Sequence, residues 1–262
     1  MPGTPPLRLL VVTPAWNEEE CVADTIREIQ AAVPHADVLV VDDGSVDRTV
    51  DRARAAGAEV LVLPFNLGVG AAMRAGFKFA LRHHYDAVIQ VDADGQHDPS
   101  EIMDIVGRLA RPETVGEAPD GRADVVVGAR FADTGTYRVR GPRRWAMTLL
   151  SKVLSRMANT RLTDTTSGFR AANRRAITLY AHHYPAEFLG DTIESLVIAI
   201  RAGVSVTQVP VHMRPRAGGE SSKSPIGATV YLFRTALILI LARIRRWPAM
   251  VVLDPDHLMP VR

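Results

Sequence analysis

Val88–Pro99 reads VIQVDADGQHDP, an apolar run that stops at two carboxylates spaced two residues apart. Residues two apart on an extended strand point to the same side, so Asp92 and Asp94 are placed to share one cation. Hard divalent ions such as Mg²⁺ and Mn²⁺ prefer oxygen ligands, and Mg²⁺ commonly takes one or two carboxylates together with substrate phosphates. The stretch is therefore a candidate site for a metal and a diphosphate, with a solvent-exposed acidic turn as the alternative.

The chain around this stretch has the composition of a folded soluble protein. Of its 262 residues, 47% are hydrophobic and 23% are charged, which suits one large domain or one domain with an appendage. The net charge of +2 gives no reason to expect a nucleic-acid partner. The single cysteine, Cys21, excludes an internal disulfide and fits a reducing compartment. Leu9–Val12 is too short for the core of a secretory signal, so we expect a cytoplasmic protein.

Short aliphatic runs alternate with helical patterns through the first half of the chain. The predicted strands are Leu9–Val12, Val38–Val41, Val60–Leu63, Val88–Val91 and Val125–Val127, and the predicted helices between them are Glu18–Ala32, Asp47–Ala56, Val69–His83 and Pro99–Leu109. Aliphatic runs of this length are typical of buried parallel strands. The alternation predicts an α/β fold, in which an open, mostly parallel, twisted sheet is flanked by helices.

Polar loops follow the first four predicted strands and therefore fall on one edge of the sheet. They are Thr13–Glu19, Asp42–Ser45, Asn66–Gly70 and the Asp92–Asp94 segment. Each loop alone has the composition that any strand-to-helix turn prefers. Open α/β sheets bind ligands beyond the carboxyl ends of their strands, so four such loops together predict a binding site.

Motifs of several common enzyme classes are absent from the sequence. There is no GxxxxGK[ST] phosphate loop and no GxSxG nucleophile elbow. Gly68-Val69-Gly70 resembles the start of a dinucleotide fingerprint, but it follows the third strand, and Arg74 stands near the place of the third glycine. These observations argue against a P-loop NTPase and a Rossmann dehydrogenase, and they give no support for an α/β-hydrolase.

Five motifs, in this order along the chain, resemble those of family 2 glycosyltransferases of GT-A fold. They are PAWNE at 14–18, VDDGS at 41–45, NLG at 66–68, DAD at 92–94 and DTTSGFR at 164–170. The chain is most similar to the dolichol- and polyprenyl-phosphate sugar synthases, which transfer mannose or glucose. The resemblance implies a catalytic domain over residues 1–223 and a separate apolar segment over 224–262.

The resemblance assigns one set of residues to the nucleotide: Pro14, Trp16, Glu18, Val41, Asp43, Asp92, Ala93 and Lys223. Within this set, the Asp43 carboxylate is suited to accept a hydrogen bond from a uracil or guanine N–H. Trp16 is suited to cover an apolar face of the nucleoside. The neighbouring Asp42 is expected to hold the turn instead.

A second set of residues is assigned to the metal and the diphosphate. The resemblance makes Asp94 the main ligand of Mn²⁺ or Mg²⁺, with Asp92 and Gln96 as further ligands, while His97 is expected to be a loop residue that faces solvent. Transfer from a nucleotide sugar leaves a diphosphate, whose negative charge a metal and arginines neutralise. Arg130 resembles the arginine of the family that meets the phosphates; the alternative is a surface arginine along the sheet edge.

The acceptor side is predicted from the second half of the chain. By resemblance Asp164 and Arg170 support the active site, and the alternative is a buried Asp–Arg pair that only shapes its loop. Asp191 and Glu194 lie three residues apart on one face of a predicted helix start. Asp191 is the candidate catalytic residue of the two, with a helix N-cap as the alternative. A hydroxyl acceptor needs a base there, whereas an ionised phosphate acceptor does not.

Residues 214–223 read RPRAGGESSK and resemble a mobile loop of the synthases, RxxGESK, that closes over the diphosphate. Arg216 matches the arginine of this motif and is assigned to the catalytic set. Ser222 stands where the lysine is expected, and Lys223 follows one position later, which puts the role of this lysine in doubt.

A strongly apolar run, Ile226–Ala242, follows Pro225 and is interrupted by Arg234. It is shorter than the roughly 20 apolar residues of a spanning helix, and basic residues and Trp247 close it. This pattern predicts a C-terminal apolar helix at the membrane surface, and hence a peripheral protein at the cytoplasmic face. The alternatives are a helix packed on the domain or in the interface of a homo-oligomer.

The combined expectation is a metal-dependent, inverting glycosyltransferase that moves a hexose from a UDP- or GDP-sugar to a polyprenyl phosphate. One alternative is the same fold acting on a hydroxyl acceptor of a cell-wall or soluble glycan. The other is a non-catalytic nucleotide-sugar-binding subunit, which the presence of Asp92, Asp94 and Arg216 disfavours.

Overall fold

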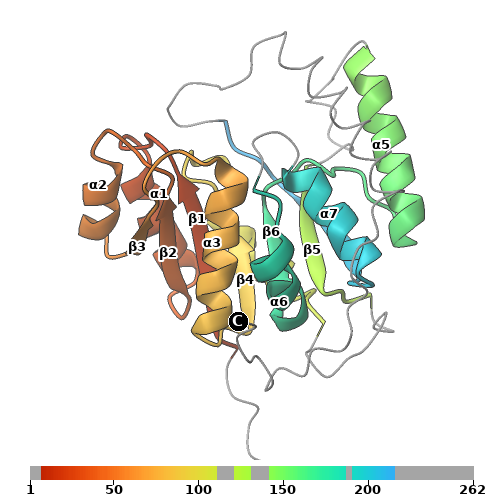
Figure 1. The fold of residues 1–262 in the computed structure, drawn as a ribbon, viewed down its shortest axis with the longest axis horizontal. Coiled ribbons are helices and arrows are strands. Elements are labelled where there is room, and N and C mark those ends of the chain that lie inside the picture. The colour runs from red at the N-terminus through yellow and green to blue at the C-terminus, as the bar shows by residue number, and fades with distance from the viewer. Residues whose placement is uncertain (1–6, 111–120, 131–141, 187–190, 216–262) are drawn as a thin grey trace, which may run out of the picture.

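A seven-stranded sheet forms the centre of the computed structural model, which describes residues 7–110, 121–130, 142–186 and 191–215 (Figure 1). The strand order is β3-β2-β1-β4-β6-β5-β7. The strands are β1 Leu9–Ala15, β2 Asp37–Asp42, β3 Glu59–Val62, β4 Ala87–Gln90, β5 Val125–Arg130, β6 Arg170–Asn173 and β7 Val206–Val211. Strand β6 pairs antiparallel with β4 and with β5, and the other pairs are parallel, so the predicted mostly parallel sheet is confirmed.

Helices cover both faces of the sheet. They are α1 Val22–Ala32, α2 Thr49–Ala55, α3 Val69–Arg82, the 3₁₀ turn η1 Pro99–Glu101, α4 Ile102–Val106, α5 Pro142–Ala158, α6 Arg174–His183 and α7 Asp191–Arg201. Figure 1 shows α3, α6 and α7 in front of the sheet, with α5 beyond α7. Alternate residues of β1 belong to the hydrophobic clusters on the two faces of the sheet. Leu10 and Val12 pack with α3, α6 and α7, whereas Leu9 and Val11 pack with α1 and α4. The period of two along a strand produces this division.

Strand β6 and helix α6 were not predicted from the sequence. Strand β6 consists of Arg-Ala-Ala-Asn, which lacks an aliphatic run although all four residues are buried. Its register is set by neighbours distant in the chain, Ala87 opposite Asn173 and Val125 opposite Ala172. The predicted apolar helix after Pro225, the domain boundary at 223, and the site residues Arg216 and Lys223 lie outside the described residues.

Candidate active site at the carboxyl edge of the sheet

The loops after β1 and β2 are joined by hydrogen bonds. The Asn17 N–H donates to Ser45 Oγ at 2.9 Å, and the Val46 N–H donates back to Asn17 Oδ1 at 2.9 Å. The Glu18 N–H donates to Thr49 Oγ1 at 2.8 Å. Asn17 has a φ of 54°, a left-handed conformation that asparagine tolerates better than most residues. The predicted convergence of the first two polar loops is therefore confirmed.

Asp43 joins the loop after β2 to the loop after β3. Its side chain is buried, with 3% exposure, and its two oxygens accept the N–H groups of Leu67 at 2.8 Å and Gly68 at 2.7 Å. Asp42 holds its own turn as expected, since it accepts the Ser45 N–H at 3.1 Å. The part that Asp43 plays in fixing the third loop was not foreseen, because it depends on residues 24 and 25 positions away.

Gly44 is the point of closest approach between these two loops. It has a φ of +74°, and a Cβ there would lie 2.7 Å from the carbonyl carbon of Phe65. We expect Gly44→Ala to lower the free energy of unfolding by about 2–4 kcal/mol, as the sum of left-handed strain and overpacking. Gly121→Ala is the matched control, since Gly121 has the same φ and nothing within 4 Å of an added Cβ. Equal losses in urea unfolding for the two variants would contradict the close approach.

The residues assigned to the nucleotide differ in the solvent exposure of their side chains. Trp16 is 49% exposed, and Pro14 and Glu18 are half-buried. The side chains of Val41 and Ala93 belong to the two hydrophobic clusters on either side of the sheet. Any contact of Val41 or Ala93 with a nucleotide therefore has to come from backbone atoms.

The two carboxylates of the DAD motif lie in the turn that follows β4, which ends at Gln90. Asp92 has a side-chain exposure of 37%, and its Oδ1 accepts the Gln90 amide at 2.8 Å. Asp94 is half-buried, and its Oδ1 accepts the Gln96 N–H at 3.1 Å. Because Asp94 lies in a turn, the alternation of an extended strand does not set its direction. The structure describes no cluster of three His, Cys, Asp or Glu side chains that could hold a metal in residues 7–110, 121–130, 142–186 and 191–215.

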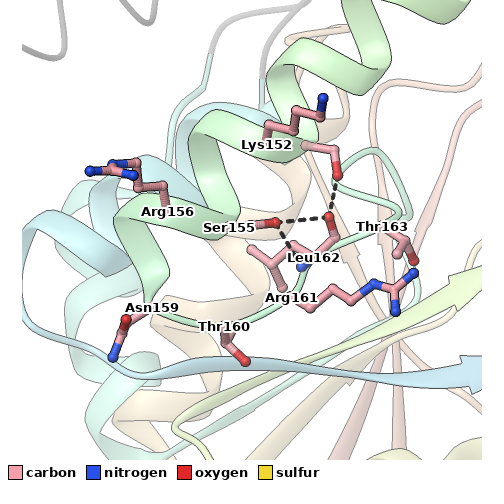
Figure 2. A pocket seen from close by; sticks show the side chains of 9 residues that line it. Lys152, Ser155, Arg156, Asn159, Thr160, Arg161, Leu162 and Thr163 are labelled. Atoms are coloured by element: carbon pink, nitrogen blue, oxygen red, sulfur yellow. Dashed lines mark hydrogen bonds between the residues drawn. The ribbon is translucent and has the colours of Figure 1, made fainter.

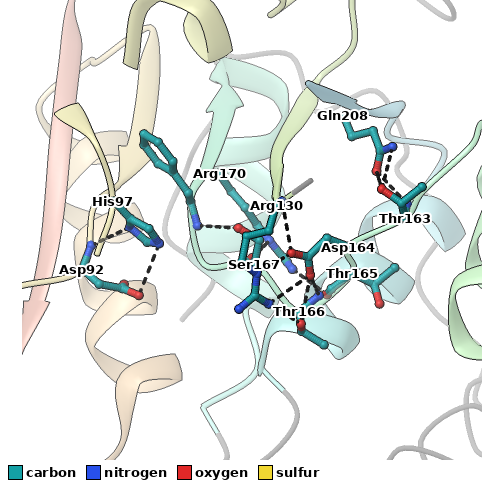
Figure 3. A network of polar contacts seen from close by, with 11 residues as sticks. Asp92, His97, Arg130, Thr163, Asp164, Thr165, Thr166, Ser167, Arg170 and Gln208 are labelled. Atoms are coloured by element: carbon teal, nitrogen blue, oxygen red, sulfur yellow. Dashed lines mark hydrogen bonds and ion pairs between the residues drawn. The ribbon is translucent and has the colours of Figure 1, made fainter. Parts of the chain in front are cut away.

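His97 lies inside the protein, and the expectation that it faces solvent is wrong (Figure 3). It is 2% exposed and stacks on Phe169 with ring centroids 4.7 Å apart and an angle of 11° between the planes. Its Nδ1 accepts the Asp92 N–H at 3.0 Å, and its Nε2 lies 3.7 Å from Asp92 Oδ2. The apolar faces of the ring are thus covered while both nitrogens meet polar groups of Asp92.

Arg130 leaves the end of β5 and pairs with Asp164 of the predicted acceptor-side loop (Figure 3). Its Nε lies 2.6 Å from Oδ2, and its Nη2 lies 3.2 Å from Oδ1 and 2.9 Å from Thr166 Oγ1. Asp164 is buried, whereas the Arg130 side chain is 43% exposed. Burial alone would raise the pKa of Asp164, but the hydrogen bonds and charge of Arg130, together with Thr166, hold that pKa below its usual range. Asp164 is therefore a carboxylate at neutral pH.

Arg170 does not pair with Asp164, so the predicted alternative of a buried pair between these two residues is wrong. The buried guanidinium of Arg170 donates instead to the carbonyl oxygens of Ser167 at 2.6 Å, Thr165 at 2.8 Å and Thr192 at 2.5 Å. It also donates to Ser195 Oγ at 3.1 Å. Arg170 thereby ties the acceptor-side loop to the first turn of α7, the helix that Asp191 opens.

Arg214 is held beside the DAD turn, two residues before Arg216. Its backbone N–H donates to the Gln96 carbonyl oxygen at 2.9 Å. Its guanidinium pairs with Asp98 at 3.0 Å and with Glu28. The segment predicted to close over the diphosphate therefore begins next to the candidate metal ligands.

A separate groove of about 580 Å³ lies between the end of α5 and the segment leading to Asp164 (Figure 2). It is lined by Ser151, Lys152, Ser155, Arg156, Asn159, Thr160, Arg161, Leu162 and Thr163. Ser155 Oγ accepts the Leu162 N–H at 2.9 Å, which fixes this segment on the helix. The lining includes three basic residues and no acidic one.

Comparison with known proteins places the chain in a family. The model of Glycosyl transferase family 2 matches residues 10–179. The undecaprenyl-phosphate mannosyltransferase of Micrococcus luteus is 33% identical over 231 residues, which cover 83% of this chain and 88% of that protein. The polyprenol monophosphomannose synthase of Mycolicibacterium smegmatis is 30% identical over 240 residues, covering 88% and 87%.

A solved structure shows the same fold. Glucosyl-3-phosphoglycerate synthase from Mycobacterium tuberculosis, in complex with Mn²⁺, uridine diphosphate and phosphoglyceric acid, has a TM-score of 0.66 and 23% sequence identity. The match covers 90% of this chain and 78% of that chain. The family match over residues 10–179 and the two mannosyltransferase relatives show that the chain belongs to glycosyl transferase family 2.

Proposed function

We propose that the protein is a metal-dependent, inverting glycosyltransferase that moves a hexose from a UDP- or GDP-sugar to a polyprenyl phosphate. The observation that carries this proposal is the position of Asp92 and Asp94 on the same sheet edge as the joined loops after β1, β2 and β3. The relatives named for undecaprenyl-phosphate and polyprenol mannosyl transfer support the lipid phosphate as acceptor.

The donor set at the DAD turn fits a divalent cation. Asp94, Asp92 and Gln96 offer two carboxylates and an amide, all oxygen ligands, and Mg²⁺ or Mn²⁺ completes such a set with substrate phosphates and water. In our proposal Asp94 is the main ligand. When bound, the ion would neutralise charge on the departing diphosphate.

The proposed transfer step assigns separate roles to residues of the chain. An oxygen of the acceptor phosphate attacks the anomeric carbon, the bond from that carbon to the diphosphate oxygen breaks, and the nucleoside diphosphate leaves with the electron pair. Arg130, which is part exposed at the end of β5, and Arg216 share the charge of the diphosphate. Trp16, Pro14, Glu18 and Lys223 hold the nucleotide.

A hydroxyl acceptor is the second candidate, and Asp191 distinguishes the two. Asp191 is the first residue of α7, whose first turn is held by Arg170. A hydroxyl must lose a proton to a base during attack, whereas a phosphate oxygen is already ionised. We expect Asp191→Asn to retain activity within about threefold on polyprenyl phosphate, and a loss of about 10²-fold or more would favour a hydroxyl acceptor. Radiolabel transfer at saturating donor measures the difference.

Product identification tests the reaction itself. The protein is incubated with Mn²⁺, a panel of UDP- and GDP-hexoses and a short polyprenyl phosphate, and the lipid fraction is analysed by mass. A hexosyl polyprenyl phosphate is the expected product. Release of nucleotide without a glycolipid would overturn the lipid acceptor, and absence of Mn²⁺-dependent nucleotide binding in calorimetry would support the non-catalytic alternative.

A peripheral position at the cytoplasmic face of the membrane is part of the proposal. None of the helices in the described part of the chain is long and apolar enough to span a bilayer. The groove beside α5 carries Lys152, Arg156 and Arg161, and these charges complement anionic lipid headgroups. The acceptor-side loop begins next to this groove, at Asp164.

Vesicle binding tests that surface. Each basic residue near an anionic membrane contributes about 1 kcal/mol, so neutralising Lys152, Arg156 and Arg161 with glutamine should weaken binding to phosphatidylglycerol vesicles by up to about 100-fold. The control neutralises three exposed basic residues elsewhere, Arg52, Arg54 and Lys78. Equal losses in sedimentation for both triple variants would exclude a specific role for the groove.

A further inference from the structure

The His97 side chain meets Asp92 at two separate points. We propose that His97 is a positioning residue, which fixes the backbone and the carboxylate of Asp92 so that the DAD turn is preorganised for a metal-bound nucleoside diphosphate. This inference rests on the proposed function. It assigns His97 an indirect role: the imidazole acts through Asp92 and contacts neither metal nor substrate.

The first contact fixes the backbone of the turn. Nδ1 of His97 accepts the Asp92 N–H at 3.0 Å, so Nδ1 carries no proton and the ring N–H is on Nε2. Asp92 follows the end of β4 by two residues, and its N–H has this imidazole as partner in place of a strand. The His97 ring therefore supplies the hydrogen-bond acceptor that a neighbouring strand would supply if β4 continued to Asp92.

The second contact concerns the carboxylate. Nε2–H of His97 lies 3.7 Å from Oδ2 of Asp92, which is an electrostatic contact at this distance and too long for a hydrogen bond. The other oxygen, Oδ1, accepts the amide of Gln90 at 2.8 Å. Gln90 and His97 are both buried, so two donors from inside the protein face the two oxygens of one carboxylate. Supporting contacts of this kind orient groups that hold metals or substrates.

The acceptor-side loop closes this arrangement from the other side. A Cβ added to Gly168 would lie 2.9 Å from Nε2 of Gln90 and 3.1 Å from Oδ2 of Asp92. The next residue, Phe169, stacks on His97. The direction of the Asp92 carboxylate is thus set jointly by β4, by His97 and by the loop that also carries Asp164.

His97 is itself held in place on its own backbone. It forms an isolated antiparallel bridge with Met213, and the adjacent Gln96 carbonyl oxygen accepts the Arg214 N–H at 2.9 Å. With the Phe169 stack, these contacts leave the imidazole little freedom. Because the His97 ring is held rigidly, it can restrict the conformation of Asp92.

Three substitutions separate the two contacts. His97→Phe keeps the ring and its stack but removes both nitrogens. His97→Asn keeps an acceptor near the position of Nδ1, and His97→Gln keeps an N–H donor near the position of Nε2. Calorimetric titration measures the affinity of each variant for UDP and for GDP, the nucleotide products of the proposed reaction, in the presence of Mn²⁺.

We expect His97→Phe to weaken Mn²⁺-dependent nucleotide binding by about 10–100-fold, the range found for residues that orient metal-holding groups. At least one of His97→Asn and His97→Gln should recover five-fold or more of this loss. Phe77→Leu is the control for destabilisation, because Phe77 is a core ring of α3 in the hydrophobic cluster that does not contain Ala93 or Phe169. It should lower the thermal midpoint without changing the nucleotide affinity.

The outcomes distinguish this inference from the proposed function. If the wild-type protein binds Mn²⁺ and nucleotide but all three His97 variants bind equally well, the positioning role is wrong and the proposed function stands. If His97→Phe loses affinity and neither polar variant recovers it, the two nitrogens are not the cause and the role is again wrong. If the wild-type protein itself fails to bind, the proposed function fails and the inference with it.

Discussion

Asp94→Asn is expected to lower the rate of sugar transfer by about 10³-fold, equivalent to about 4 kcal/mol of transition-state stabilisation. The substitution removes one negative charge from the proposed main ligand of the divalent cation. It retains an oxygen that can accept the Gln96 N–H, which Asp94 accepts at 3.1 Å, so the turn should keep its shape. The loss should therefore appear in kcat and in Mn²⁺ affinity, with little change in the thermal midpoint.

Asp47→Asn is the matched control for this prediction. Asp47 lies in the loop after β2; its Oδ1 accepts the Thr49 N–H at 2.9 Å, and its Oδ2 accepts the Glu19 N–H at 3.2 Å. The same chemical change there should leave kcat within about threefold, because asparagine keeps the contact with Thr49 and loses only the longer one with Glu19. Asp94→Asn activity within threefold of wild type across a Mn²⁺ titration would contradict the metal role of Asp94.

The part of the fold that could be predicted is the part that depends on local patterns. Each of the five strands predicted in the first half is an aliphatic run bounded by polar turns, and alternation with helices is sufficient to place their carboxyl ends on one edge. The DAD motif fell on that edge because it directly follows such a run. The bond from Gln90 to Asp92 was not predicted.

What could not be predicted depends on contacts between distant parts of the chain. The sequence around Asp164 does not reveal that its partner is Arg130, 34 residues earlier, and that Arg170 turns toward α7. His97 was expected to face solvent as a loop residue, yet it stacks on Phe169, 72 positions later in the chain. Strand β6 is recognisable only through its pairing partners, since a short run of Arg, Ala and Asn has little strand propensity.

Arg130→Met is expected to lower kcat by about 10²-fold, because it removes a cation proposed to face the diphosphate. The same change should lower the free energy of unfolding at pH 7 by about 2 kcal/mol. The loss arises because the substitution leaves the buried Asp164 carboxylate without its cation. The expected loss is smaller than the roughly 3–5 kcal/mol found when a fully buried pair is broken, since Arg130 is partly exposed. Asp164→Asn removes the buried charge and leaves Arg130 charged, so its losses should be smaller, within about tenfold in kcat and about 1 kcal/mol in stability.

The pH dependence of unfolding separates these two variants further. In the wild type the folded-state pKa of Asp164 is lowered, so its contribution to stability is present above the unfolded pKa of about 4 and is lost as pH falls through the folded value. In Arg130→Met the cation and its side-chain hydrogen bonds are gone, and burial is opposed only by the hydrogen bonds from Thr166 and from the backbone N–H of residue 130. We expect burial, the largest cause, to raise the pKa of Asp164 above its unfolded value, so stability is lost as pH rises through that raised value. The deficit of Arg130→Met relative to wild type should therefore grow from pH 4 to pH 7 in urea unfolding. The Asp164→Asn variant lacks this titrating group, and should lack both of these transitions.

A stability deficit of Arg130→Met that is the same at pH 4 and pH 7 would show that Arg130 does not set the ionisation of Asp164. The catalytic loss would then have to come from Arg130 alone, without any contribution through its buried partner.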